Sequence, residues 1–427
     1  MRFKTVNEWL DWQQGLSPVM IDLGLERVAR VSEAMALDRP AGKVITVAGT
    51  NGKGSCVAML EAILLAAGYR VGTYTSPHLL RYNERIRLNG RQVDDQRLCQ
   101  AFEHVDRQRA DVRLTYFEFG TLAALDLFRQ QELDVAVLEV GLGGRLDAVN
   151  IVDADVALVT SIALDHVDWL GPDRETIARE KAGIFRPAKP AVCCDPQPPV
   201  NLSVEAGRIG APLYCLGRDF WYRPTNHGDW TWQHGDNSLA HLPTPALSGD
   251  FQYANAAGAI MALEQSGLAY EHRHVSRGLT QVRLPGRFQQ LFDNGRRIIL
   301  DVAHNGQAAS ALAAMLGHTA IEGRVRAVIA MLNDKDIDGT VRMLADSVDD
   351  WYVAGLNHPR GCPAAQMAQH IRSFARPRRV CDSVLAAYRA ALGDAEPDGD
   401  CILVFGSFYT VAEVLDTVPA ARVGASV

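Results

Sequence analysis

The sequence has no long apolar run and no excess of basic residues. No apolar stretch approaches the roughly 20 residues that a helix needs to span a bilayer. The 43 lysines and arginines are outnumbered by 50 acidic residues, and the formal net charge is −7. Both signs are interspersed, so the chain lacks the basic footprint of a nucleic-acid-binding protein. We therefore expect no nucleic-acid partner and no membrane association.

Paired-cysteine motifs and targeting signals are also missing. The eight cysteines are scattered, and only Cys193 and Cys194 are adjacent. Without a CxxC pair, neither a zinc site nor a thiol redox centre is predicted. The segment 1–8 lacks the apolar core of a signal peptide, and the chain shows no internal repeat or low-complexity tract. These absences favour a soluble cytoplasmic enzyme, which at 427 residues is long enough for two domains.

What is present is a glycine-rich segment between a predicted strand, 43–47, and an apolar helical segment that ends near Gly68. Successive backbone N–H groups and a helix N-terminus can hold a polyphosphate in this context, and Lys53 would reach its outer phosphates. The alternative is a tight strand-to-helix connection without a ligand. The segment departs from a Walker A motif, which places glycine where Val47 stands and a hydroxyl where Gly54 stands. Its residues are Gly49, Thr50, Asn51, Gly52, Lys53, Gly54 and Ser55.

Strand and helix patterns alternate along the chain, which is typical of a mostly parallel sheet covered on both faces. We predict an α/β protein with a P-loop-type sheet domain over 1–285 and a smaller Rossmann-like domain over 286–427. A hairpin signal at 293–295 opens the second domain. A β-rich insertion is expected over 213–247. The other predicted strands are 71–75, 134–140, 155–162, 191–194, 297–302, 325–331, 351–354 and 401–405, and the clearest helices are 117–131 and 174–185.

Polar residues follow several of these strands, where functional groups of such sheets gather. Glu139 ends one strand and Asp165-His166 follow the next, so they could complete a cation site beside the glycine-rich segment. Asp301–Asn305 has the same form in the second domain, although Asn305 could instead cap the following helix. The segments 334–336 and 406–408 could be ordinary strand-to-helix turns.

Taken together, these segments resemble the bacterial bifunctional dihydrofolate synthase/folylpolyglutamate synthases, a family of ATP-dependent amide ligases related to the Mur ligases. The resemblance runs over nearly the whole chain and in one order. The segments that carry it are 21–25, 49–55, 75–79, 115–120, 139–148, 160–166, 179–185, Arg287, 301–305 and 406–409.

The resemblance implies two Mg²⁺ ions and ATP as co-substrate. Ser76, Glu139 and His166 match the family's magnesium ligands, whereas general phosphate-loop chemistry would nominate Ser55, which we keep as a nucleotide contact. Lys181 matches a lysine that is carbamylated in the family and would help to bind the second Mg²⁺. The alternative for Lys181 is a surface lysine facing Glu175 and Glu180.

The resemblance also implies where the substrates bind. ATP would lie in a cleft between the domains and contact residues 49–55. Asn255, Arg287 and Asp301 would contact it from the far side of that cleft. The C-terminal domain would close over ATP and bind glutamate. His304 could assist phosphate transfer, beside Lys53 and Lys181 as catalytic residues. Phe117 could pack against the pterin ring or belong to the core. The family's pterin-binding elements fall on Asp22, Leu23, Gly24, Leu25, Thr115, Tyr116, Phe117, Glu118, Leu146, Asp147 and Ala148.

The implied reaction is the ATP-dependent ligation of L-glutamate to dihydropteroate and to folates, through an acyl phosphate, by a monomer. Three alternatives remain. The first is a folylpolyglutamate synthase only, because both activities share one chemistry. The second is a Mur-type ligase, but those enzymes carry a domain ahead of the phosphate loop and only 48 residues precede Gly49 here. The third is a nucleotide switch, but residues 333–336 do not match the guanine-reading Asn-Lys-x-Asp.

Overall fold

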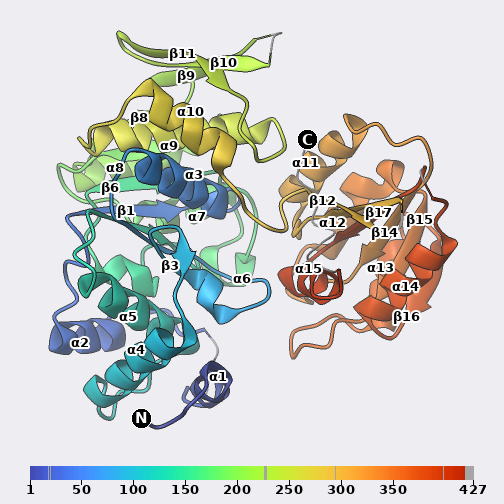
Figure 1. Ribbon diagram of the computed structural model, residues 1–427, viewed down its shortest axis with the longest axis horizontal. Coiled ribbons are helices and arrows are strands. Elements are labelled where there is room, and N and C mark those ends of the chain that lie inside the picture. Colours follow the sequence, from blue (N-terminus) through green and yellow to red (C-terminus); the bar gives the residue numbers. More distant parts are fainter. Residues whose placement is uncertain (18, 20, 226–227, 294, 398, 419–427) are drawn as a thin grey trace. The chain divides into compact units, whose positions relative to one another are not determined.

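The protein divides into two compact units (Figure 1). The computed structural model describes all residues except 18, 20, 226–227, 294, 398 and 419–427. The first unit comprises residues 1–246 and 250–283, and the second comprises residues 247–249 and 284–427.

The first unit is built on an eight-stranded sheet with the strand order β4-β3-β2-β5-β1-β6-β7-β8. All neighbours pair in parallel from β2 to β8, and β3 and β4 add an antiparallel edge. The central strands are buried on both faces, which explains their continuous apolar sequences. The strands are β1 (Lys43–Ala48), β2 (Val71–Tyr74), β3 (Ile86–Leu88), β4 (Arg91–Gln92), β5 (Val135–Glu139), β6 (Val156–Val159), β7 (Ala191–Cys193) and β8 (Leu213–Cys215).

Helices cover both faces of this sheet (Figure 1). One face carries α3 (Lys53–Ala66), which packs against α9 (Phe251–Gln265) and α10 (His272–Gln281). The other carries α5 (Tyr116–Arg129), on which α1 (Val6–Gln14), α2 (Glu26–Met35) and α4 (Asp95–Gln108) are assembled. Beyond them, α7 (Arg174–Ala182) and α8 (Val200–Ile209) pack together and share a core with β6, β7 and β8. The predicted doubly covered parallel sheet is therefore confirmed.

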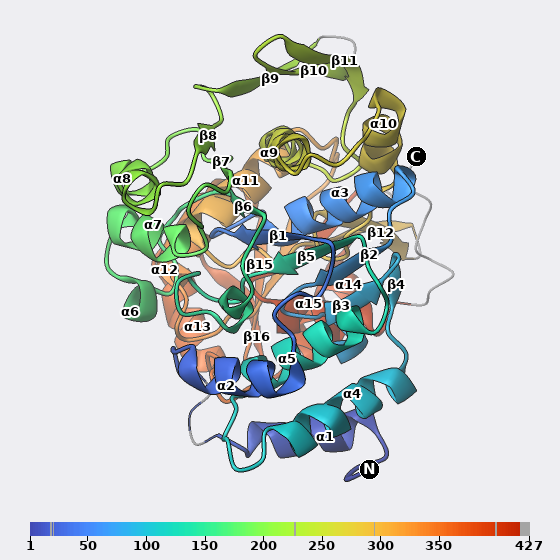
Figure 2. The same ribbon diagram turned by 90° about the vertical axis from the view of Figure 1, so that its left-hand side faces the viewer.

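The β-rich insertion is a separate three-stranded antiparallel sheet of β9 (Phe220–Pro224), β10 (Asp229–His234) and β11 (Asn237–Pro243). It lies beyond α9 and α10 in both views (Figures 1 and 2). Its Trp230 and Trp232 are buried, and the Trp232 indole N–H donates to the carbonyl of Ala257 in α9. These aromatic side chains serve packing. The predicted start of the insertion at Leu213 was wrong, because β8 is the last strand of the main sheet.

The second unit is a six-stranded sheet with the order β12-β13-β17-β14-β15-β16. The predicted hairpin is confirmed by the antiparallel pairing of β12 (Gln289–Asp293) with β13 (Arg296–Leu300), although Asn294 of its turn lies outside the described residues. β14 (Val325–Ile329), β15 (Asp350–Ala354), β16 (Pro377–Cys381) and β17 (Cys401–Phe405) are parallel to β13. β16 escaped prediction because most of it is exposed and polar.

In the described residues of the second unit, five α-helices flank the sheet. Residues of α11 (Gly306–Gly317), α12 (Ile337–Leu344) and α13 (Ala364–Arg372) share one core with alternate residues of the strands. α14 (Val384–Asp394) packs against β14, β15 and α15 (Phe408–Leu415). No helix in the described part of the chain is long and apolar enough to cross a membrane.

Candidate active site

The glycine-rich segment joins the central strand β1 to α3, as predicted. Gly52 is the residue before the helix, and Lys53 is its first residue. The Lys53 ammonium donates to the backbone carbonyls of Gly49 and Thr50, each at 3.1 Å. It therefore lies folded over the loop, at the positive end of the α3 dipole, where a phosphate group would bind.

The loop is held from the side by the residues that follow β6. The Thr50 N–H donates to the Ser161 carbonyl at 2.7 Å, and the Thr160 hydroxyl donates to the Asn51 carbonyl at 2.7 Å. Gly49 has a φ of 146°, and an added Cβ would lie 1.7 Å from the Thr160 hydroxyl oxygen. Only glycine fits there, because the backbone conformation and the neighbouring side chain both exclude a Cβ.

Asn255 approaches the loop from α9, within the first unit. Its side-chain amide donates to Gln252 at 2.9 Å, and an added Cβ on Gly52 would lie 2.6 Å from its carbonyl oxygen. The expectation that Asn255 contributes from the far domain was wrong, because α9 packs on the phosphate-loop helix α3. Ser55 is buried and accepts a hydrogen bond from Gln252 at 3.4 Å. Its hydroxyl oxygen therefore already accepts one hydrogen bond inside the fold.

The predicted cation ligands follow three strands of the same sheet. Ser76 follows β2, and its N–H donates to the Glu139 carboxylate at the end of β5, at 3.3 Å. His166 follows β6, and its backbone N–H donates to the Asp165 carboxylate at 2.9 Å. β5 and β6 lie on opposite sides of β1, so Glu139 and His166 flank the loop rather than end neighbouring strands.

Lys181 is buried in the last turn of α7, with an exposed fraction of 2%. Burial, reinforced by the positive charge of Lys53, lowers its pKa to about 7. The alternative of a surface lysine paired with acids was wrong. Glu180 forms an ion pair with Arg145, and Glu175 accepts from backbone N–H groups at the start of α8.

The donor atoms at these positions suit a divalent cation. Among the described residues, no three His, Cys, Asp or Glu side chains gather as a ready metal site. The predicted set offers only two such residues, Glu139, which is buried, and His166, which is partly exposed, and adds the Ser76 hydroxyl. Carboxylate and hydroxyl oxygens are hard ligands, and an imidazole is also compatible with divalent metals. A carbamate on Lys181 would add a further oxygen donor.

Two of the three predicted pterin-binding segments are joined by Arg27, which sequence reasoning missed. Its guanidinium forms ion pairs with Asp22 at 2.9 Å and with the buried Glu118 at 3.1 Å. Glu118 also accepts from the Thr115 N–H at 2.7 Å in the capping box that begins α5. A basic residue two positions after the 22–25 segment, in the first turn of α2, was the available signal. The bridge therefore ties the loop before α2 to the start of α5.

Phe117 and Asp147 face the same region from different elements. Phe117 is partly buried: its ring lies 5.9 Å from that of Tyr74, and an added Cβ on Gly141 would lie 2.6 Å from it. Asp147 accepts from the N–H groups of Leu142 and Val149 at 2.8 and 3.0 Å. Burial raises the pKa of Asp147 to about 6. Leu146 and Ala148 flank it, and Ala148 begins the short helix η2 (Ala148–Ile151).

In the second unit, Asp301 and His304 follow β13. Asp301 is buried, and its carboxylate accepts from the N–H groups of Phe288 and Ala303, each at 2.8 Å. Burial raises the pKa of Asp301, and Arg287 opposes that shift. The His304 Nδ1 atom lies 2.7 Å from the Val302 carbonyl oxygen.

Phe408, which sequence reasoning had not singled out as a site residue, lies against the side chains of Arg287 and His304. The Arg287 guanidinium lies 5.0 Å from the centre of its ring, and the His304 ring lies 6.3 Å from it. The capping alternative is confirmed for Asn305, whose side chain caps α11. The segments 334–336 and 406–408 are strand-to-helix turns, in which Asp336 caps α12 and Ser407 caps α15.

Comparison with known proteins matches both units to one family. Residues 47–195 match the Mur ligase middle domain, and residues 286–408 match the Mur ligase glutamate ligase domain. The chain is 49% identical to the dihydrofolate synthase/folylpolyglutamate synthase of Escherichia coli K12 over 97% of this chain and 96% of that protein. The Haemophilus influenzae protein of the same name is 39% identical over 95% and 96% of the two chains.

Solved structures agree in fold. The E. coli FolC structure with DHPP and ADP has a TM-score of 0.93 and 48% identity, covering 98% of this chain and 99% of that one. A bifunctional folylpolyglutamate synthase/dihydrofolate synthase with Mn, AMPPNP and L-glutamate bound has a TM-score of 0.90 at 48% identity, over 97% and 98% of the chains. ATP as co-substrate and a need for a divalent metal follow from this kinship. The resemblance read from the sequence is therefore confirmed: this chain belongs to the dihydrofolate synthase/folylpolyglutamate synthase family of Mur ligases, which are ATP-dependent amino-acid ligases.

Proposed function

We propose that the protein ligates L-glutamate to 7,8-dihydropteroate, giving dihydrofolate, and to tetrahydrofolates, giving folylpolyglutamates. The observation that carries this proposal is the Asp22–Arg27–Glu118 bridge. It joins two segments resembling the family's pterin-binding elements, in the same unit as the phosphate loop. A pterin site beside a phosphate loop supports the use of dihydropteroate as well as of folates.

The reaction needs activation of a carboxylate, because carboxylate oxygen is a poor leaving group. The substrate carboxylate attacks the γ-phosphorus of ATP, which forms an acyl phosphate and releases ADP as the leaving group. The α-amine of L-glutamate then attacks the carbonyl carbon, loses its proton, and phosphate leaves. The chain's contribution is positioning and charge compensation. Lys53, held over the loop by two carbonyls, is assigned to the phosphates of ATP.

We assign Ser76, Glu139 and His166 to one Mg²⁺ ion and Lys181, as a carbamate, to a second. Magnesium bound there would offset the negative charge of the phosphates. CO₂ adds to a neutral amine and releases a proton, so burial that disfavours the Lys181 ammonium supports this modification.

The remaining assignments rest on the resemblance and on the positions of the residues. Residues 49–55 and Asn255 of the first unit, with Arg287 and Asp301 of the second, are assigned to ATP. Residues 22–25, 115–118 and 146–148 are assigned to the pterin. His304 is assigned to phosphate transfer, and we take 1–285 and 286–427 as the domains, the second binding glutamate. We propose that the protein acts as a monomer.

The test is ADP release by the purified protein with ATP and Mg²⁺, with or without L-glutamate, and with dihydropteroate or tetrahydrofolate as acceptor. Glutamate-dependent release with both acceptors is expected. ADP release with tetrahydrofolate alone would mean that the protein is a folylpolyglutamate synthase only. No ADP release with either acceptor would favour the Mur-type alternative.

The assignment of Lys53 to the phosphates of ATP is tested by a separate variant. Lys53→Ala should lower kcat at least about 100-fold with either acceptor, because a preorganised charge at the reacting group is lost. Lys4→Ala removes an exposed lysine far along the chain and serves as the matched control. Unchanged turnover in a folded Lys53→Ala protein would remove the assignment.

A further inference from the structure

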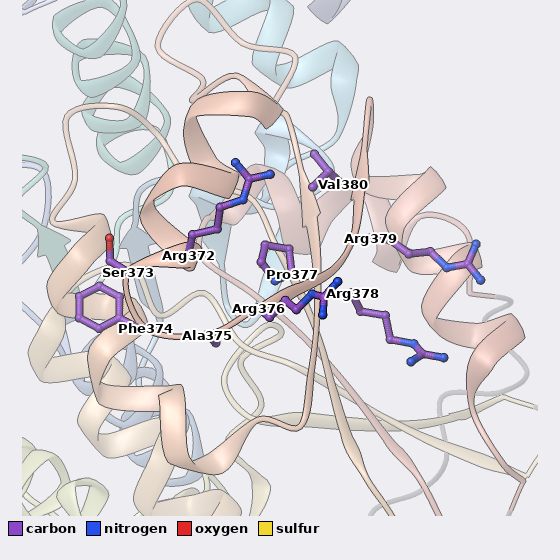
Figure 3. Close-up of a pocket in the computed structure, with 9 residues that line it drawn as sticks. All are labelled: Arg372, Ser373, Phe374, Ala375, Arg376, Pro377, Arg378, Arg379 and Val380. Carbon is purple, nitrogen blue, oxygen red and sulfur yellow. The ribbon is translucent and has the colours of Figure 1, made fainter.

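A hollow of about 680 Å³ opens on the second unit, where α13 leads into β16 (Figure 3). We call it the arginine hollow. Its lining residues are Arg372, Ser373, Phe374, Ala375, Arg376, Pro377, Arg378, Arg379 and Val380. Four of these nine are arginines and none is acidic, in a chain whose net charge is −7. Such a concentration of one charge makes the hollow a local anion-attracting surface.

In the described part of the chain, the guanidinium groups of two of the four arginines are not paired with an acidic side chain. Within the part of the chain that the structure describes, neither Arg372 nor Arg376 forms a hydrogen bond or an ion pair with a side chain or carbonyl. Arg378 and Arg379 share one carboxylate, that of Asp394, at 3.4 and 2.9 Å. Because one carboxylate serves two guanidinium groups, the hollow keeps a net positive charge.

A β-bulge brings Arg378 and Arg379 to the same side. Trp351 is paired with Pro377, whereas the next residue, Tyr352, is paired with Arg379, so Arg378 is the extra residue. In a regular strand, neighbouring side chains would point to opposite faces. Figure 3 shows Arg378 and Arg379 extending to one side of the strand, and Arg372 and Phe374 on the other.

A fifth arginine supports the wall of the hollow. The Arg342 guanidinium, from α12, lies 5.3 Å from the centre of the Phe374 ring. This contact packs the connection between α13 and β16 onto α12, and it adds positive charge beside the hollow.

The hollow is separate from the candidate site of its unit. The segment 373–376 enters β16, so it lies at the amino-terminal edge of the parallel strands. Asp301 and His304 follow β13 and lie at the carboxyl-terminal edge. The mechanism assigned above uses no residue of the hollow.

We propose that the arginine hollow binds the γ-glutamyl tail of folylpolyglutamates as a second site, apart from the catalytic residues. This rests on the proposed function, since the tail is the product of repeated glutamate ligation. Each added glutamate contributes one carboxylate, and planar guanidinium groups match carboxylates well. A single exposed pair is weak, but several carboxylates on one chain bind several arginines at once.

The edge strand favours a small flexible chain over a protein strand. Among the strands that the structure describes, β16 pairs with β15 alone, so its outer edge presents backbone N–H and C=O groups to the amides of a ligand. Pro377, the bulge and the charged side chains are the devices by which edges avoid pairing with another protein strand. A γ-linked tail needs no regular strand register.

The proposal is tested by equilibrium binding, without ATP, of fluorescent hexa-γ-glutamate to the full-length protein, with free glutamate and tri-γ-glutamate as unlabelled competitors. We expect affinity to rise at least about tenfold from tri- to hexaglutamate, and to fall with added salt. Arg372→Gln/Arg376→Gln should weaken hexaglutamate binding about fivefold or more, because two charge pairs are lost. Arg91→Gln/Arg389→Gln, which removes two exposed arginines elsewhere, should bind like the wild type.

Either equal binding by the Arg372→Gln/Arg376→Gln protein or no dependence on chain length would overturn the proposal. Tighter binding of α-linked hexaglutamate would also overturn it, in favour of an acidic protein segment. Ligation of the first glutamate to dihydropteroate is measured in parallel. If ligation fails while tail binding persists, the proposed function fails and the hollow still binds carboxylate chains; if ligation is intact and tail binding absent, only this inference fails.

Discussion

The side-chain carbonyl oxygen of Asn255 occupies the space in which a side chain on Gly52 would begin. An ideal Cβ on Gly52 would lie 2.6 Å from that oxygen, and the φ of Gly52 is 93°. Glycine is therefore required twice over, by the left-handed backbone and by the amide from α9. The phosphate loop and α9 fit each other at this residue, although about two hundred residues separate them in the chain.

Gly52→Ala should abolish measurable turnover and weaken nucleotide binding at least about tenfold, because the loop must move to relieve the contact with Asn255. Titration with a fluorescent ATP analogue checks this. Gly68→Ala is the matched control: Gly68 has a similar φ of 90° but nothing within 4 Å of an added Cβ. It should cost about 1 kcal/mol of stability and leave nucleotide affinity unchanged. Equal nucleotide binding by both variants would contradict the steric argument.

Lys181→Met should remain folded and at least as stable as the wild type, because an apolar side chain of similar length avoids the cost of burying an amine. It should nevertheless lose at least about 100-fold in kcat, since the proposed carbamate is removed. The direct measurement is ¹³C NMR of protein equilibrated with ¹³CO₂. A carbamate signal is expected in the wild type and not in Lys181→Met, and its absence from the wild type would refute the modification.

Arg27→Ala should raise the KM for dihydropteroate about tenfold while changing the KM for ATP little, because the bridge between Asp22 and Glu118 is broken. Steady-state kinetics with each substrate varied in turn checks this. Arg30→Ala is the control one turn further along α2, where the ion pair with Asp111 is exposed. Its stability should change by less than about 0.5 kcal/mol. A rise in both KM values in Arg27→Ala would indicate general damage instead of a pterin-specific role.

Acid should weaken the second unit through Asp400. Burial alone would raise its pKa, but the N–H groups of Arg324 and Glu396 and the Arg326 guanidinium hold the pKa of Asp400 below its ordinary value of 3.8. A lowered pKa in the folded state stabilises the fold above about pH 4, and this contribution is lost as the pH falls through the folded pKa.

Asp400→Asn should therefore lower the free energy of unfolding by about 1–3 kcal/mol at pH 7, since Arg326 loses a charged partner. The difference from the wild type should shrink at pH 3, below the ordinary pKa of 3.8, because the unfolded chain binds a proton there more readily than the folded one. Urea unfolding at both pH values measures it, with Asp111→Asn as an exposed control. A difference that is the same at both pH values would show that charge is not the cause.

Much of the fold was predictable because buried parallel strands have a strong local signal. The runs that became β1, β5, β14 and β17 are continuous and apolar, so sequence alone located them. β16 was missed because an edge strand with two arginines has no such run. β8 was assigned to the insertion because three residues carry too little pattern to distinguish two sheets.

Only part of the candidate site was predictable from the sequence. Gly49, Gly52 and Lys53 stand in a contiguous segment, and a strand–turn–helix context gives such residues a local meaning. Lys181 was ambiguous, since a lysine on a helix is exposed more often than buried. Arg27 was missed altogether, because its role depends on two partners, one of them far along the chain.

By itself, the sequence determined the α/β class, the phosphate loop, the strand ends that carry polar residues, and the family. These features depend on the spacing of residues that are close in the chain, because such local patterns determine the backbone conformation within a few residues. Only the tertiary structure decided that Asn255 belongs beside Gly52, that Lys181 is buried, that Arg27 bridges two segments, and that a bulge gathers arginines on β16. Each of these depends on packing between residues distant in the chain, and such packing is set by how whole elements fill space together.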